Sequence, residues 1–154
     1  MSQLTEERSA GAVLFNRNTD LLIEQKGLPR DLKSGQIVFL LLQYPAGHWD
    51  FPKGNIEKGE NEIDTARREV SEETNIDDIH IKSGFKKVVE YYYKRGPALI
   101  HKKVTYYLAE VTTTKVQISE EHLGYQWLSI DESIAKVSFE KSKKVLLDAN
   151  KFIV

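Results

Sequence analysis

The sequence contains no cysteine. Such a chain forms no disulfide and offers no thiolate to a metal ion, so we expect an intracellular, cytoplasmic location. Long apolar runs are also missing, because the longest, residues 37–42, is far shorter than the ~20 residues that a membrane-spanning helix needs. The N-terminal segment MSQLTEERSAG shows no signal-peptide organisation. We therefore expect neither a secreted protein nor a membrane partner.

An excess of charge of either sign is absent as well. The net charge is −1 over 154 residues, of which 40% are hydrophobic and 29% are charged. This balance is ordinary for a globular protein, and the length suits one domain, which we place at residues 1–154. The bulk charge indicates no polyanionic partner, so we expect no stable complex with nucleic acid, and we expect a monomer.

Charge is nevertheless unevenly distributed along the chain. Residues 57–78 hold nine acids and three bases, whereas residues 82–103 hold seven Lys or Arg and one Glu. An acidic, metal-binding segment followed by a basic segment suits a ligand that is a metal–polyphosphate complex. The alternative for the basic segment is a solvated strand pair with lysines on its exposed face.

The most informative stretch is residues 54–76, GNIEKGENEIDTARREVSEETNI. It predicts a loop that leads into a helix from about Glu62 to Thr74. Glu69, Glu72 and Glu73 stand at i, i+3 and i+4, so their carboxylates gather on one side of that helix. Three like charges weaken an isolated helix unless a hard cation such as Mg2+ lies among them. The spacing therefore predicts a metal-dependent site for phosphate chemistry.

A glutamate-rich helix also has a second interpretation, a solvated face with scattered salt bridges. The apolar residues of the same segment, Ile63, Ala66 and Val70, recur at i, i+3 and i+7. This spacing predicts a stripe that packs on the core. We therefore expect an amphipathic helix whose acidic edge lies beside its buried edge.

The rest of the chain mixes strand patterns with turns and two further helical patterns. A mixture of this kind predicts an α/β (α+β) fold in which helices pack on the faces of a sheet. The apolar runs at 37–43 and 103–111 are expected to be central strands, and Trp127 is expected in the core. The remaining expected elements are strands at 10–15, 21–24, 49–51, 80–95 (broken near 83–84) and 125–128, a turn at 16–20, a loop at 26–36, and helices at 131–135 and 139–153.

Residues 54–76 resemble the Nudix box, G-x5-E-x7-R-E-U-x-E-E-x-G-U, where U is a bulky aliphatic residue. One position departs from it, because Asn75 stands where the family has Gly, just past the helix end. Asn is the next most tolerant residue of the left-handed conformation found there. The residues that match the box are Gly54, Glu60, Arg68, Glu69, Val70, Glu72, Glu73 and Ile76.

The resemblance implies a Nudix-type α/β/α sandwich around a mixed sheet. It also implies a divalent cation, Mg2+ with Mn2+ as a possible substitute, that binds Glu69, Glu72 and Glu73 and bridges the phosphates of the substrate. Glu69 or Glu73 would lie closest to the activated water.

Two further roles follow from the same resemblance. Arg68 would pair with Glu60 and orient the loop on the helix, whereas an ordinary surface pair would contribute under about 1 kcal/mol. The backbone around Lys53 and Gly54 would supply a carbonyl ligand to the metal.

Over residues 10–153 the chain resembles a narrower group, the asymmetrical diadenosine tetraphosphate hydrolases of the animal type. The matching stretches are FLLLQ at 39–43, HWDFPKGNIEKGE at 48–60, GFKK at 84–87, YYLAEV at 106–111 and SEEHLGYQWL at 119–128. This resemblance implies a substrate site made of His48 and Lys53 on the phosphates, Tyr91 with Lys94, Phe139 on the adenine where the group has Tyr, and Glu121 as a further metal ligand or base.

Several of these residues also have a structural interpretation. His48 could cap a loop, and Glu121 could be an ordinary loop carboxylate. The run at 91–93 consists of three tyrosines that alternate across a strand, so at least one ring is expected in the core.

The leading hypothesis is a metal-dependent hydrolase that cleaves diadenosine tetraphosphate asymmetrically to ATP and AMP by attack of water on a phosphorus. One alternative is a pyrophosphohydrolase acting on nucleoside triphosphates or on triphosphorylated RNA 5′ ends, because the box recognises metal and diphosphate rather than a base. Another is a non-catalytic domain that binds a nucleotide, although such domains usually lose the box glutamates that this chain retains.

Overall fold

The computed structural model describes residues 4–17 and 35–154. The expected strand at 21–24 and most of the expected loop at 26–36 lie outside the described residues. Within the described ranges, the expected strand and helix types are all present, and several strands are longer than expected.

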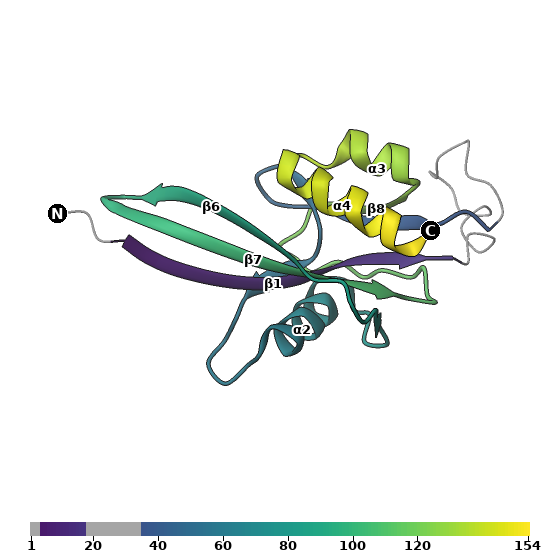
Figure 1. The fold of residues 1–154 in the computed structure, drawn as a ribbon, viewed down its shortest axis with the longest axis horizontal. Coiled ribbons are helices and arrows are strands. Elements are labelled where there is room, and N and C mark those ends of the chain that lie inside the picture. The colour runs from purple at the N-terminus through teal and green to yellow at the C-terminus, as the bar shows by residue number, and fades with distance from the viewer. Residues whose placement is uncertain (1–3, 18–34) are drawn as a thin grey trace.

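Two long parallel strands form the centre of the sheet (Figure 1). Strand β1 (Leu4–Asn16) runs beside β7 (Ala98–Glu110) along its whole length, from Leu4 opposite Leu99 to Phe15 opposite Glu110. The described strands make an eight-stranded sheet in which all other pairings are antiparallel, so the sheet is mixed as expected. The remaining strands are β2 (Val38–Gln43), β3 (Trp49–Asp50), β4 (Lys53–Asn55), β5 (His80–Ile81), β6 (Lys87–Arg95) and β8 (Gly124–Leu128).

Helices cover both faces of this sheet. Figure 1 shows α2 (Glu62–Thr74) on one side, and α3 (Ile130–Lys136) with α4 (Glu140–Ile153) on the other. Side chains alternate along β1, so Val13 and Phe15 join the core beneath α4, whereas Ala12 and Leu14 join the core beneath α2. The predicted three-layer sandwich is confirmed.

Local signals determine where α2 begins and ends. Asn61 and Asp64 form a capping box at its start. Asn75 ends it in the left-handed conformation, with φ 60° and ψ 25°, as the resemblance to the box implied. Ala66 and Val70 are fully buried, but Ile63 is 41% exposed, so its predicted place in the stripe is wrong. Thr65, which directly precedes Ala66, is buried instead, and the buried edge is turned away from Ile63.

Strands β1, β6 and β7 extend beyond the helices as a three-stranded ribbon (Figure 1). Because the ribbon runs past the described helices, the prediction that one of the three tyrosines at 91–93 lies in the core is wrong. Tyr91 is 36% exposed and Tyr92 is 62% exposed, and Tyr93 is partly exposed. Trp127, by contrast, is buried as expected, and its indole N–H donates to the Thr114 carbonyl.

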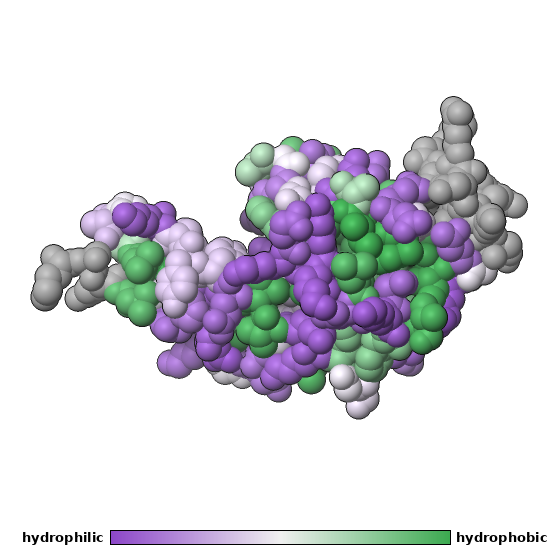
Figure 2. Space-filling view, turned by 45° about the horizontal axis from the view of Figure 1, so that its top comes forward, coloured by the Kyte–Doolittle hydropathy of each residue, from purple (hydrophilic) through white to green (hydrophobic). Residues whose placement is uncertain are grey.

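The surface is mostly hydrophilic on the face seen in Figure 2, with hydrophobic residues grouped on the body of the molecule and a smaller group toward the end of the extension. No helix in the described part of the chain combines the length and the apolar character needed to cross a membrane.

Candidate active site

A glycine allows the loop before α2 to lie directly on that helix. Strand β4 pairs with β1, where Gly54 faces Ala10. A Cβ added at Gly54 would lie 2.0 Å from the carboxylate carbon of Glu69. No other residue type could bring the backbone this close, so Gly54 permits the contact between the loop and the acidic edge of α2.

Arg68 connects the loop to the helix, as the resemblance implied. Its guanidinium donates to both carboxylate oxygens of Glu60, with Nε 2.6 Å from Oε2 and Nη2 3.0 Å from Oε1. It also donates to the Asn55 carbonyl at 2.9 Å, to Glu69 at 2.8 Å and to Glu72 at 3.2 Å. The guanidinium lowers the pKa of the Glu60 carboxyl to about 2. Arg68 therefore orders Glu60, Glu69 and Glu72 around it.

Glu69 and Glu73 are the buried members of the acidic edge, with side chains 13% and 10% exposed. Burial raises the pKa of Glu69. Burial first, and then the carboxylates of Glu69 and Glu121, raise the pKa of Glu73 to about 8. The Lys53 N–H partly offsets this effect by donating to Glu73 Oε2 at 3.0 Å. Two neighbouring buried carboxylates that resist ionisation form a site that a cation would stabilise.

Glu72 differs from these two, since its side chain is 58% exposed and is held by Arg68. Residues 4–17 and 35–154 contain no cluster of three such side chains already arranged around a metal position. The donor chemistry nevertheless fits a hard divalent cation, because Glu69 and Glu73 offer carboxylate oxygens only, and Gly54 leaves the adjoining backbone free of a side chain.

His122 is a site residue that the sequence analysis did not single out. Its side chain is 1% exposed, and its Nδ1 lies 2.8 Å from Ser119 Oγ. Its Nε2 lies 3.8 Å from Glu73 Oε1 and has no hydrogen-bond partner among the described residues. Glu121, the adjoining residue, is exposed, and its charge reaches both Glu73 and His122. A buried unpaired nitrogen beside Glu73 indicates a site that a group from outside the chain completes.

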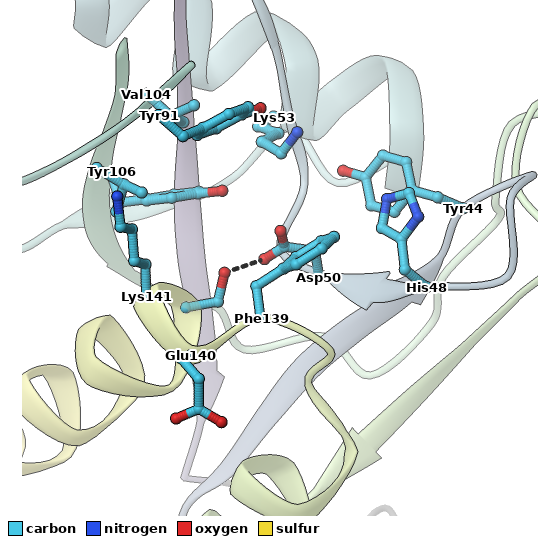
Figure 3. A pocket seen from close by; sticks show the side chains of 12 residues that line it. Tyr44, His48, Asp50, Lys53, Tyr91, Val104, Tyr106, Phe139, Glu140 and Lys141 are labelled. Carbon is cyan, nitrogen blue, oxygen red and sulfur yellow. Dashed lines mark hydrogen bonds between the residues drawn. The ribbon is translucent and has the colours of Figure 1, made fainter. Parts of the chain in front are cut away.

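An aromatic cavity of about 620 Å³ opens beside the acidic edge (Figure 3). Four residues expected to bind substrate line it together, namely His48, Lys53, Tyr91 and Phe139. They come from the segment around β3, from β4, from β6 and from the start of α4, so the fold brings together residues that are far apart in sequence. Figure 3 shows Tyr91 and Phe139 on different sides of the space between them.

The cavity also contains residues that the sequence analysis left unassigned. Tyr44 stacks on His48 with ring centroids 4.9 Å apart, and Lys53 Nζ lies 5.4 Å from the Tyr44 ring centroid. Asp50 and Ser142 form a hydrogen-bonded pair at the cavity wall. A signal for Asp50 was available, because it lies two residues after His48, and residues at that spacing share one face of an extended segment. No local signal marks Ser142, which reaches the site through the packing of α4.

Lys94 does not line the cavity. It pairs with Leu99 across the β6–β7 hairpin, three residues beyond Tyr91, and therefore lies on the opposite face of the strand. On the hairpin, the lysine that shares the face of Tyr91 is Lys102, which is directly opposite it. Burial and the charge of Lys53 lower the pKa of Lys102, so the two ammonium groups lie in one neighbourhood. Lys102 and Lys53 together make a basic edge for an anionic ligand.

Comparisons with known proteins agree with this geometry. Residues 5–149 match the NUDIX domain family. The chain is 36% identical over 152 residues to the asymmetrical bis(5′-nucleosyl)-tetraphosphatase of Rattus norvegicus, and 38% identical over 152 residues to that of Sus scrofa. Each alignment covers 95% of both chains. A crystal structure of a C. elegans Ap4A hydrolase binary complex superposes with a TM-score of 0.76 at 28% identity, covering 96% of this chain and 97% of that one.

Proposed function

This chain belongs to the Nudix hydrolase family, and from that premise we propose that it cleaves diadenosine tetraphosphate asymmetrically to ATP and AMP. The relatives that are 36% and 38% identical carry the name of that activity, and the alignments cover nearly all of this chain. The named activity and the arrangement of the site therefore support the same reaction.

One observation carries the proposal, namely that Lys53 joins the aromatic cavity to the acidic edge of α2. Its backbone N–H binds Glu73, while its side chain lines the cavity beside Tyr44. A ligand with its base in the cavity would place its phosphates next to Lys53 and the carboxylates. A nucleoside polyphosphate has this shape, with a flat base at one end and a chain of phosphates leading from it.

Nudix hydrolases generally use a divalent metal, and we propose Mg2+, with Mn2+ as a substitute. Glu69, Glu73 and the more exposed Glu72 would hold the ion, together with a backbone carbonyl near Lys53. When bound, it would lower the pKa of water and neutralise charge on phosphate oxygens.

The residues of the chain supply the remaining functions. Lys53 and Lys102 would balance phosphate charge, and the aromatic rings would hold the base. A water oxygen would bond to an outer phosphorus while the phosphoanhydride bond on its far side breaks. The proton of that water would pass to a carboxylate, for which Glu69, Glu73 and Glu121 are the candidates. Arg68 would act by positioning, since it holds the loop and the glutamates rather than the substrate.

A substrate panel tests this function. The purified chain is incubated in the presence of Mg2+ with one substrate at a time. The substrates are diadenosine tetraphosphate, the four nucleoside triphosphates and a triphosphorylated RNA, and the products are separated by chromatography. We expect ATP and AMP from the dinucleotide, with a specificity constant well above those of the other substrates. Faster release of pyrophosphate from a triphosphate would identify a pyrophosphohydrolase instead, and binding without any turnover would identify a non-catalytic domain.

A further inference from the structure

Asp50 is a buried carboxylate with one oxygen directed into the aromatic cavity. Asp50 is only 3% exposed. Oδ1 accepts two hydrogen bonds, from the Phe51 N–H at 2.9 Å and from Ser142 Oγ at 3.0 Å. No described residue donates to Oδ2, and Figure 3 shows this oxygen turned toward the space between Tyr91, Lys53 and Tyr106. The protein therefore satisfies one half of the carboxylate and leaves the other half to whatever enters the cavity.

The surroundings of Asp50 make an unused acceptor at this place unfavourable. Burial raises the pKa of Asp50, and Lys53, the Phe51 N–H and Ser142 act in the opposite direction. Hydrophobic and aromatic groups make up much of the wall, including Val89, Val104 and Phe139. A carboxylate oxygen of a residue that is 3% exposed, with no donor among the described residues, gains most from a ligand that brings an N–H.

The aromatic rings restrict the kind of ligand that can bring such a donor. His48 and Phe139 lie with ring centroids 5.2 Å apart, and Tyr91 faces them across the cavity. Rings arranged in this way favour a flat heteroaromatic group, which can stack on them and present its edge to the wall. A purine with an amino group at C6 offers N–H donors on that edge. A purine with an oxo group at C6 offers an acceptor there, which a carboxylate oxygen repels.

We propose that Asp50 determines base specificity, accepting a hydrogen bond from the 6-amino group of a purine held between the rings. This inference rests on the proposed function, because the purine is taken to be the base of the dinucleoside polyphosphate. Asp50 thereby selects adenine over hypoxanthine, while the family's acidic site acts on the phosphates of either ligand. One hydrogen bond to a charged group corresponds to a preference of about ten- to a hundredfold.

Asp50→Asn tests the assignment because it is nearly isosteric and changes one atom's role. The Phe51 N–H and the Ser142 hydroxyl still require an acceptor, so the amide oxygen takes the Oδ1 position and the NH2 group faces the cavity. The cavity then presents a donor in place of an acceptor. We expect the variant to prefer hypoxanthine over adenine, which is a reversal that a general loss of stability would not produce.

The kinetic arm measures kcat and KM for diadenosine tetraphosphate and diinosine tetraphosphate. For the unmodified chain we expect a specificity constant ten- to a hundredfold higher for the adenine compound, mostly through KM. Asp50→Asn should bring the ratio to one or below. Asp78→Asn is the matched control, since it makes the same acid-to-amide change at an exposed residue that does not line the cavity. It should keep the original ratio.

The binding arm needs neither turnover nor a folded variant. Calorimetry on the unmodified chain compares AMP, IMP and purine riboside 5′-monophosphate, which lacks any substituent at C6. We expect AMP to bind at least tenfold more tightly than the other two. Equal affinities for the three nucleotides, or an unchanged substrate ratio in a folded Asp50→Asn variant, would overturn the assignment. If the unmodified chain cleaves neither dinucleotide, the proposed function fails, and the three affinities still decide the role of Asp50.

Discussion

The acidic edge of α2 and the aromatic cavity beside it are built on opposite principles, although Lys53 belongs to both. At the acidic edge, Arg68 binds Glu60, Glu69 and Glu72 simultaneously, so protein groups hold three of the carboxylates. In the cavity, large parts of the wall are left uncovered by the described residues. Phe139 is 48% exposed, Tyr91 is 36% exposed, and one oxygen of Asp50 has no donor from a described residue.

This difference separates the part of the site that carries out the chemistry from the part that recognises the base. Charge-assisted hydrogen bonds from Arg68 hold these carboxylates in place before any ligand arrives, which is what a reaction centre requires. Open ring faces gain their contacts only from a ligand, which is what a base-binding subsite requires. We therefore expect changes at the acidic edge to lower kcat and changes in the cavity to raise KM.

Removal of divalent metal is expected to have the largest effect and to separate the two regions most clearly. Treatment with excess chelator should abolish hydrolysis of diadenosine tetraphosphate, and added Mg2+ or Mn2+ should restore it, because the donor set consists of carboxylate oxygens. Binding of AMP in the cavity, measured by calorimetry in the same chelator, should change less than about threefold, since Tyr91 and Phe139, which hold the base, are not among the proposed metal ligands. Full turnover in chelator would refute the metal-dependent mechanism.

Glu73→Gln should come next, with a loss of about a thousandfold or more in kcat, equivalent to about 4 kcal/mol. Glu72→Gln should have a smaller effect, because the Glu72 side chain is 58% exposed and that of Glu73 is 10% exposed. The fold should survive, since the amide removes the repulsion that Glu69 and Glu121 exert on Glu73. Steady-state kinetics at saturating Mg2+ and thermal unfolding without metal measure the two effects, and near-native turnover by Glu73→Gln would contradict the assignment.

The contrast between the regions also explains what could be predicted from the sequence. The bounds of α2 were predicted correctly from its local pattern, and the Arg68–Glu60 pair was implied by the resemblance to the box, whose residues lie within one continuous segment. The left-handed conformation of Asn75 at the helix end was expected because asparagine tolerates that conformation better than most residues. Interactions within one segment can be recognised from the spacing of its residues along the chain.

The cavity depends on register and packing, which sequence spacing does not contain. The resemblance implied Lys94 as the partner of Tyr91, whereas pairing across the β6–β7 hairpin places Lys102 directly opposite Tyr91. The tyrosines at 91–93 were expected to supply a core ring, but the strands carrying them extend beyond the helices that would cover them. Ser142 is 92 positions from Asp50 in the sequence, so their hydrogen bond is seen only in the folded chain.

The aromatic walls should affect binding more than turnover. Tyr91→Ala and Phe139→Ala should each raise the KM for diadenosine tetraphosphate roughly ten- to a hundredfold, because stacking of a base on a ring contributes about 1–3 kcal/mol. The value of kcat should fall much less. Tyr92→Ala is the control, since Tyr92 is 62% exposed and, as the neighbour of Tyr91, lies on the other face of the strand. Unchanged KM values in both ring variants would remove the recognition role from the cavity and favour a triphosphate pyrophosphohydrolase.

The smallest effect is expected at the basic edge, where the two lysines of one hairpin provide a matched pair. Lys102→Ala should raise the KM for diadenosine tetraphosphate about three- to tenfold at low salt, because Lys102 lies on the cavity face with Lys53 and meets the phosphate charge. Added salt should reduce this difference, since ions screen partly exposed charges over a Debye length of about 10 Å at 0.1 M. Lys94→Ala removes the same charge from the opposite face and should leave KM unchanged at every salt concentration. If Lys94→Ala weakened binding as much as Lys102→Ala did, net charge rather than strand register would govern affinity, and the phosphates would not follow the cavity face.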